Sequence, residues 1–127
     1  MRDRRSEATV KILVVDDDAE IRELLKIFLE SNGHTVVLID KGAPVIKTVL
    51  NETFALVLLD VNLPDINGIE LLEKIHKVDA ELPVVMITAF KDAEKVITAF
   101  RAGAVDCLLK PLNFEYLKTS VLNRARR

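Results

Sequence analysis

Four groups of polar residues in this chain of 127 residues could act together, and each directly follows an apolar segment: Asp16, Asp17 and Asp18; Asp60; Thr88; and Lys110. Carboxylates that lie close together repel one another, and such a cluster is tolerated when a divalent cation neutralises it. Oxygen ligands with no Cys or His beside them favour a hard ion, so Mg²⁺ is the expected one. A metal beside a carboxylate also prepares a site where that carboxylate can attack phosphorus and form an acyl phosphate.

A phosphoryl group on one of these acids would have two further partners. Lys110 is expected to pair with one phosphate oxygen, and the Thr88 hydroxyl to hydrogen-bond another. Each residue taken singly has a simpler interpretation. Thr88 is then a strand-end hydroxyl and Lys110 a solvated charge. The acids at 16–18 then cap the first helix, with Glu20 completing a capping box from Asp17.

These residues can meet only if the strands that carry them end at one edge of a sheet. The apolar run at residues 54–59 has no polar break before Asp60, which is typical of a strand buried on both faces in a parallel sheet. The sequence predicts the other strands at residues 11–15, 35–39, 84–87 and 105–109. Apolar residues at helical spacing predict the intervening helices, at about residues 21–31, 44–51, 68–78, 93–102 and from 113 onward.

Strands joined by helices of this length lie parallel, and right-handed crossovers place helices on both faces of the sheet. The predicted fold is therefore α/β, a doubly wound five-stranded parallel sheet of flavodoxin-like type with strand order 2-1-3-4-5. In that order the first and third strands are neighbours, which brings Asp16, Asp17 and Asp60 together. The expected inward-facing residues of the third and last helices are Leu71, Leu72, Ile75 and Val78, and Phe114, Leu117 and Val121.

Composition excludes several classes of function. A net charge of -2, no Trp and 5% aromatic residues argue against direct binding of nucleic acid. No apolar run approaches the roughly 20 residues that span a bilayer, so no membrane association is expected. A single Cys cannot form an internal disulfide, which makes the cytoplasm the expected location. Residues 1–9 are predicted to be frayed or disordered, and residues 10–127 to form one domain.

Four motifs, in this order, resemble the receiver domain of two-component response regulators: Val14-Val15-Asp16-Asp17-Asp18, Asp60 with Pro64 and Gly68, Ile87-Thr88-Ala89, and Lys110-Pro111. The resemblance runs from about residue 11 to the end of the chain. It implies that Asp60 accepts a phosphoryl group from the phosphohistidine of a histidine kinase or phosphotransfer protein, or from a small acyl phosphate. It also implies Mg²⁺ held by Asp17, Asp60 and the backbone carbonyl of Asn62, with Asp16 assisting through water.

The same resemblance implies further roles. Lys110 would contact the phosphoryl group through its side chain, and its peptide bond to Pro111 would be cis. Thr88, followed by Ala89, would move toward the phosphoryl oxygens and so act as a switch. The protein would not be an enzyme in the usual sense, but would assist its own phosphorylation and dephosphorylation. Its output would pass to a partner, an output domain or a second copy through the fourth helix, last strand and last helix.

One position departs from the family pattern, because Cys107 stands where an aromatic residue is usual, three residues before Lys110. The coupling between Thr88 and the output surface of the domain is therefore expected to differ from the family pattern, with Cys107 as a small buried hydrophobe.

Two alternatives to a phosphorylated receiver domain remain. A Mg²⁺-dependent phosphohydrolase with an aspartyl-phosphate intermediate would need a second acid where Asn62 stands, and a cap domain for which 127 residues leave no room. The second alternative is an interaction module that is never phosphorylated. His34 and His76 are interpreted as surface residues.

Overall fold

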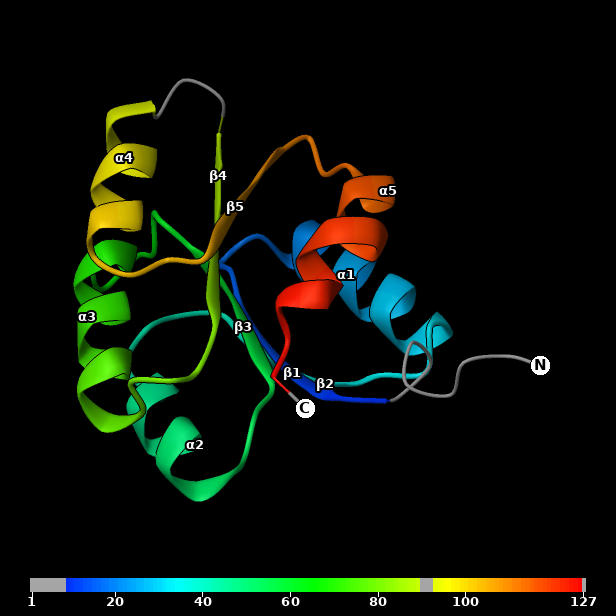
Figure 1. The fold of residues 1–127 in the computed structure, drawn as a ribbon, viewed down its shortest axis with the longest axis horizontal. Helices are drawn as coiled ribbons and strands as arrows, with labels where there is room; N and C mark the ends of the chain where they lie inside the picture. Colours follow the sequence, from blue (N-terminus) through cyan, green and yellow to red (C-terminus); the bar gives the residue numbers. More distant parts are fainter. Residues whose placement is uncertain (1–8, 90–92, 127) are drawn as a thin grey trace.

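The computed structural model describes residues 9–89 and 93–126, which form a sheet covered by helices on both faces (Figure 1). The sheet has five strands in the order β2-β1-β3-β4-β5, and all neighbouring strands are parallel. The strands are β1 (Lys11–Val15), β2 (Thr35–Ile39), β3 (Leu56–Asp60), β4 (Val84–Ala89) and β5 (Asp106–Lys110). The predicted fold class and strand order are confirmed.

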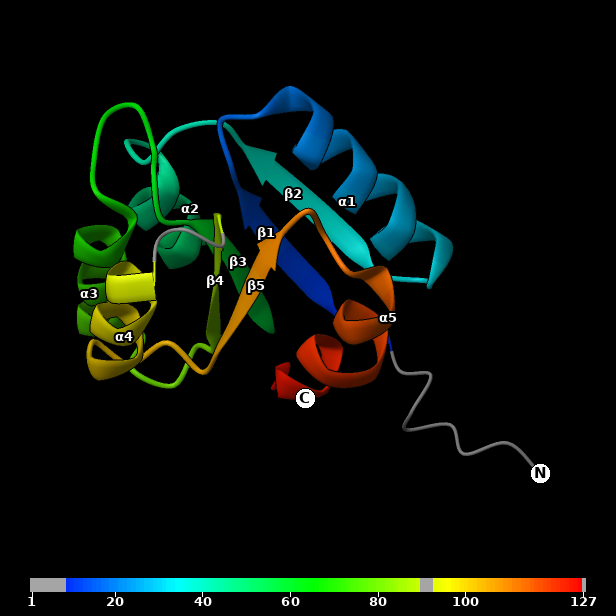
Figure 2. The same cartoon turned by 90° about the horizontal axis from the view of Figure 1, so that it is seen from above.

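Two layers of helices cover the sheet (Figures 1 and 2). One face carries α1 and α5, and the other carries α2, α3 and α4. The helices are α1 (Ala19–Ser31), α2 (Val45–Asn51), α3 (Gly68–Val78), α4 (Ala93–Arg101) and α5 (Phe114–Tyr116). No helix among the described residues is long and apolar enough to cross a membrane.

Each strand supplies side chains to both helical layers in turn. In β1, Ile12 and Val14 pack in the core beneath α1 and α5, whereas Leu13 and Val15 pack beneath α2 and α3. All four side chains are fully buried. This burial on both faces explains why the strand sequences are continuous apolar runs and do not alternate with polar residues.

Local signals in the sequence set the ends of several helices. The side chain of Asp18 caps α1 by accepting hydrogen bonds from the backbone N–H groups of Glu20 and Ile21, at 2.9 and 3.5 Å. The cap is thus Asp18 and not Asp17, so the capping-box interpretation is wrong. Gly33, with φ of 90°, lies in the left-handed region just past the end of α1, as its Asn-Gly sequence predicts.

Several bounds and one buried position also differ from the sequence predictions. Val78 is 41% exposed, because it lies at the edge of the α3 stripe in the last helical position; Leu82 is buried in the same core. The strand predicted at residues 105–109 runs from Asp106 to Lys110. The last helix begins at the predicted place, but a π-helical turn at Leu117–Val121 and a 3₁₀ turn at Leu122–Arg124 interrupt it. Leu117, Val121 and Leu122 in these turns are buried.

The described chain ends with a set of contacts at the amino edge of the sheet. Arg126 donates from both Nη atoms to the Asp79 carboxylate, at 3.0 and 2.6 Å, and from Nε to the Phe54 carbonyl at 3.0 Å. Its backbone N–H donates to the Ala55 carbonyl at 3.0 Å. Arg126 therefore joins the last turn to the segment that leads into β3. Of residues 1–9, which were expected to be frayed, residues 1–8 lie outside the described residues, and Thr9 is exposed.

Candidate functional site

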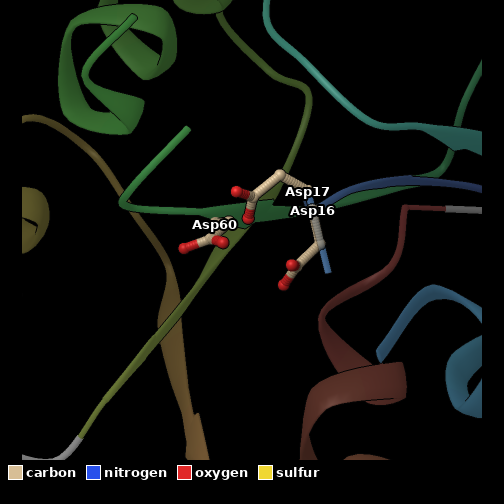
Figure 3. A group of neighbouring side chains, drawn as sticks. All are labelled: Asp16, Asp17 and Asp60. Atoms are coloured by element: carbon tan, nitrogen blue, oxygen red, sulfur yellow. The ribbon is translucent and has the colours of Figure 1, made fainter. Parts of the chain in front are cut away.

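The acidic residues meet at the carboxyl ends of β1 and β3 (Figure 3). Asp60 is the last residue of β3 and only 4% exposed, while Asp16 follows β1 and is fully buried. Because β1 and β3 are neighbours, carboxylate oxygens of Asp16, Asp17 and Asp60 lie within 4.8 Å of one another. Asp17 is exposed and forms the open side of the group. The structure thus brings together the three acids that the strand order predicts.

Lys110 reaches this cluster from the far side of β4. Its Nζ lies 3.3 Å from Asp16 Oδ2 and 3.7 Å from Asp60 Oδ2. Burial alone would lower the pKa of Lys110, but the negative charges of Asp16 and Asp60 outweigh it and raise the pKa, so the ammonium stays charged. The peptide bond between Lys110 and Pro111 is cis, as the resemblance implies. A single cation thus contacts two of the three acids.

Asp60 is a carboxyl group with an unusual titration. Burial raises the pKa of Asp60 to about 7, and the charge of Asp16 adds to this rise. The backbone N–H of Asn62 donates to Asp60 Oδ1 at 2.9 Å, and this hydrogen bond and Lys110 lower the pKa in part. The carboxylate form of Asp60 is therefore costly in the protein alone, and added positive charge would favour it.

The donor atoms fit a hard divalent cation. Asp16 Oδ1 accepts a hydrogen bond from the backbone N–H of Asp18 at 2.9 Å. Asp16 Oδ2 is buried and accepts no hydrogen bond among the described residues; its near neighbour is Lys110. A buried carboxylate oxygen with no hydrogen-bond donor has spare capacity to bind a cation. The group contains only oxygen donors, which suits Mg²⁺ better than a softer metal.

The loop after β3 is held tightly beneath Asp60. Gly68 N–H donates to the Val61 carbonyl at 2.7 Å, and a Cβ added at Gly68 would lie 2.2 Å from the Asp60 carbonyl oxygen. Only glycine allows this approach of α3 to the strand end. The Asn67 side chain caps α3, accepting a hydrogen bond from Ile69 N–H at 2.8 Å. The spacing from Asp60 to Gly68 thus has a packing cause.

The predicted switch residues lie on β4, between Asp60 and Lys110 in the sheet. Asp60 pairs with Ile87, Thr88 with Leu109, and Ala89 with Lys110. Thr88 is 1% exposed, and Ala89 is partly buried. Both residues belong to β4, which extends two residues beyond the strand predicted at 84–87. Their position at the carboxyl edge suits contact with a group attached to Asp60.

Cys107 lies deeper in the sheet, opposite Met86. Its side chain is partly buried and packs against the core beneath α2, α3 and α4. Burial raises the pKa of the Cys107 thiol to about 11, and the charge of Asp106 adds to the rise. A thiol with so high a pKa is a poor nucleophile at neutral pH, which agrees with its interpretation as a small hydrophobe.

Sequence reasoning did not select two residues that contact this site. Lys95 in α4 donates from Nζ to Asn62 Oδ1 at 2.8 Å, and Arg22 in α1 donates from Nη1 to the Asp16 carbonyl at 2.8 Å. Neither belongs to a motif. Arg22 could have been suspected from its place one turn into the helix that follows the acids, but no local pattern points from Lys95 to Asn62, 33 residues away.

The two histidines are partly buried and not simply on the surface. His34 Nδ1 accepts a hydrogen bond from Val10 N–H at 3.2 Å, and His76 Nε2 lies 3.2 Å from the Leu82 carbonyl. The His76 ring also packs against Gly103, where an added Cβ would lie 2.9 Å from it. Both rings therefore have structural contacts away from the acids.

Two proteins of similar sequence carry the name transcriptional regulatory protein. The "Transcriptional regulatory protein CpxR homolog" of Haemophilus influenzae is 45% identical over 103 residues, which are 81% of this chain and 44% of that protein. The "Transcriptional regulatory protein ZraR" of Escherichia coli is 35% identical over 112 residues, 88% of this chain and 25% of that protein. The chain thus spans less than half the length of these relatives.

Solved structures show the same fold over most of the chain. A CheY-like response regulator receiver domain protein from Methanospirillum hungatei is 33% identical with a TM-score of 0.85, covering 92% of this chain and 94% of that one. The receiver domain of NtrX from Brucella abortus is 33% identical with a TM-score of 0.84, covering 89% and 96%. Residues 12–122 match the family model described as the response regulator receiver domain. The chain therefore belongs to the response regulator receiver domain family.

Proposed function

We propose that this receiver domain is a phosphoacceptor switch in which Asp60 takes a phosphoryl group from the phosphohistidine of a histidine kinase or a phosphotransfer protein. The arrangement of charges around Asp60 is the observation that carries the proposal. Asp16 and Asp17 have carboxylate oxygens within 4.8 Å of those of Asp60, and Lys110 Nζ lies 3.7 Å away. Acids that can hold a cation and an ammonium that can hold a phosphate oxygen thus flank one buried carboxylate.

The proposed transfer is a displacement at phosphorus. A carboxylate oxygen of Asp60 attacks phosphorus, and the bond from phosphorus to the donor imidazole breaks, with its electron pair returning to the imidazole nitrogen. Asp16, Asp17, Asp60 and the carbonyl of Asn62 would hold Mg²⁺, which supplies positive charge that offsets the charge of the phosphoryl group. Ionisation of Asp60 is required, and Lys110 favours it by lowering the raised pKa of that carboxyl in part.

Lys110, Thr88 and Ala89 are the proposed partners of the transferred group. The Lys110 ammonium would pair with one phosphoryl oxygen and the Thr88 hydroxyl would hydrogen-bond another, while the chain at Ala89 shifts with Thr88. The same residues would also support hydrolysis of the acyl phosphate, so the domain would assist its own phosphorylation and dephosphorylation. It would have no separate substrate to turn over.

The output of the switch is also part of the proposal. Names such as transcriptional regulatory protein among the longer relatives support an output domain or a protein partner. The face of α4, β5 and α5 is the proposed surface for that contact or for a second copy, with Cys107 altering how β5 responds. The proposed domain comprises residues 10–127 and works in the cytoplasm, where one free cysteine stays reduced.

Mass spectrometry of the intact protein tests the proposal. Incubation with Mg²⁺ and a small acyl phosphate is expected to add one phosphoryl group to the parent and none to Asp60→Asn, since the amide cannot form an acyl phosphate. Asp65→Asn is the matched control, because Asp65 lies in the same loop but binds the backbone N–H groups of Gly42 and Ala43. Equal labelling of the parent and Asp60→Asn would contradict the proposal.

A further inference from the structure

A lysine from α4 lies beside the phosphoryl site without belonging to the motif residues. Lys95 Nζ donates a hydrogen bond to Asn62 Oδ1 at 2.8 Å. Asn62 in turn donates its backbone N–H to Asp60 Oδ1 at 2.9 Å. One residue therefore joins the ammonium of Lys95 to the carboxylate that is to be modified. The acceptor of the Lys95 bond is a neutral amide oxygen, so the bond lacks the Coulomb attraction that an anionic acceptor would add.

The balance of charge around a modified Asp60 leaves room for one more cation besides Lys110 and the proposed Mg²⁺. Lys110 contacts Asp16 and Asp60, while Asp17 adds a third negative charge to the same group. A phosphoryl group replaces the single charge of a carboxylate with about two negative charges and adds strong acceptor oxygens. An anionic phosphoryl oxygen attracts an ammonium more strongly than a neutral amide oxygen does, because Coulomb attraction between opposite charges adds to the hydrogen bond. Lys95, on its flexible four-carbon stem, would therefore favour a phosphoryl oxygen over Asn62 Oδ1.

The helix that carries Lys95 is lightly attached to the fold. Ala99 is the buried residue of α4, whose residues are all described, and Ile97 and Phe100 are 54% and 46% exposed. An element with so little buried surface shifts at a low cost in free energy. The free energy of one charged contact at the first turn of α4 is thus enough to change the preferred position of this helix.

We infer that Lys95 is a second phosphoryl-binding lysine, held by Asn62 Oδ1 in the unmodified protein and moved to an oxygen of the phosphoryl group once Asp60 is modified. The inference rests on the proposed function of Asp60. In the modified state Lys95 ties the beginning of α4 to the phosphoryl group, so α4 responds directly to modification. Lys110 holds the group from the β5 side, and Lys95 holds it from the α4 side.

The test uses beryllofluoride with Mg²⁺ as the probe, since it mimics a phosphoryl group on a carboxylate. Lys95→Gln is expected to weaken the apparent affinity for the probe by about fivefold, the scale of one charge-assisted contact near the surface. Lys95→Arg should restore most of the affinity. Arg101→Gln removes the same charge from the exposed far end of the same helix and should leave the affinity unchanged.

A second measurement separates this role from a structural one. Backbone amide chemical shifts in α4 should change when the probe binds to the parent, and these changes should be lost in Lys95→Gln, while changes near Lys110 persist. Equal affinities and equal α4 changes in the parent and Lys95→Gln overturn the inference and leave the proposed function intact. If the parent does not bind the probe and is not phosphorylated at Asp60, both the proposed function and the inference fall. Urea midpoints of the variants show whether each is folded.

Discussion

Asp60 illustrates how neighbouring groups set the pKa of one buried carboxyl group. Its neighbours have opposite effects on its pKa. Burial and the charge of Asp16 raise the pKa, the Asn62 N–H and Lys110 lower it, and the net result is a pKa of about 7. A folded-state pKa above that of the unfolded chain means that the protonated form favours folding. This stability is fully present below about pH 4 and is lost as pH rises through about 7.

The first prediction concerns Asp60→Asn in the absence of metal. The neutral amide removes the charge that destabilises the folded state, so we expect a higher free energy of unfolding than the parent at about pH 8 and a similar one at about pH 4. The gain at high pH should be on the order of 1 kcal/mol or more, since each unit of pKa shift corresponds to about 1.4 kcal/mol. Urea denaturation with a chelator present measures both values.

The control is the response to Mg²⁺. Added Mg²⁺ should raise the urea midpoint of the parent, because a ligand that binds only the folded state stabilises it, and should raise that of Asp60→Asn much less. A parent whose stability relative to Asp60→Asn does not change with pH would contradict the raised pKa of Asp60.

At the scale of elements, two glycines near the site make a matched pair: Gly68 is the first residue of α3, and Gly42 lies in the loop between β2 and α2. An added Cβ at Gly68 would lie 2.2 Å from the backbone carbonyl oxygen of Asp60, whereas one at Gly42 would lie 2.2 Å from Cγ2 of Ile66. A backbone atom at the end of a buried strand cannot move without moving Asp60, but the end of a side chain can rotate away. The same substitution should therefore have unequal effects.

We predict that Gly68→Ala lowers the free energy of unfolding by about 3 kcal/mol or more and weakens Mg²⁺ binding, while Gly42→Ala costs about 1 kcal/mol or less. Urea denaturation and a Mg²⁺ titration followed by amide chemical shifts measure the two effects. Equal losses in the two variants would show that the loop after β3 can relax away from the strand.

Much of this arrangement of elements could be predicted from the sequence, for a physical reason. Continuous apolar runs identified the buried strands, and the carboxyl edge of a parallel sheet brought Asp16 and Asp60 together. Contacts between distant elements could not be predicted, since the bond from Lys95 to Asn62 depends on where α4 lies. The π-helical turn at Leu117–Val121 was also hidden, because an apolar pattern does not distinguish a regular helix from one with an inserted residue.

At the scale of the whole molecule, the pair of Arg126 and Asp79 joins the last described turn to the end of α3. The hydrogen bonds from Arg126 lower the pKa of Asp79. A lowered folded-state pKa means that the pair stabilises the fold above the unfolded pKa of Asp79, and that this stability is lost as pH falls through the folded value. The side chains of Arg126 and Asp79 are 33% and 28% exposed, so solvent screening reduces the effect.

We predict that Arg126→Gln lowers the free energy of unfolding by about 1 kcal/mol at neutral pH, because Asp79 and the Phe54 carbonyl lose a charged donor. Lys26→Gln is the control, since Lys26 forms an exposed pair with Glu30 within α1 at 3.5 Å, and it should change stability much less. A double-mutant cycle with Asp79→Asn isolates the pair. A coupling energy near zero would mean that the loss in Arg126→Gln comes from its side-chain bond to the Phe54 carbonyl and not from its pairing with Asp79.

Because α4 buries little of its surface, its sequence can change during evolution at a low cost in stability. Ile97 and Phe100 on α4 and Leu109 on β5 are 54%, 46% and 41% exposed, so their exchange leaves the two cores nearly untouched. Residues on this face can therefore be substituted one at a time without a prior stabilising mutation elsewhere. Substitution of Gly68 or Asp60 would instead disturb the packing or the charges of the site. Duplicated copies of the gene could acquire different binding partners through this face while the residues around Asp60 stay the same. In the laboratory, selection from a library of variants of this face alone could change the partner that the domain binds.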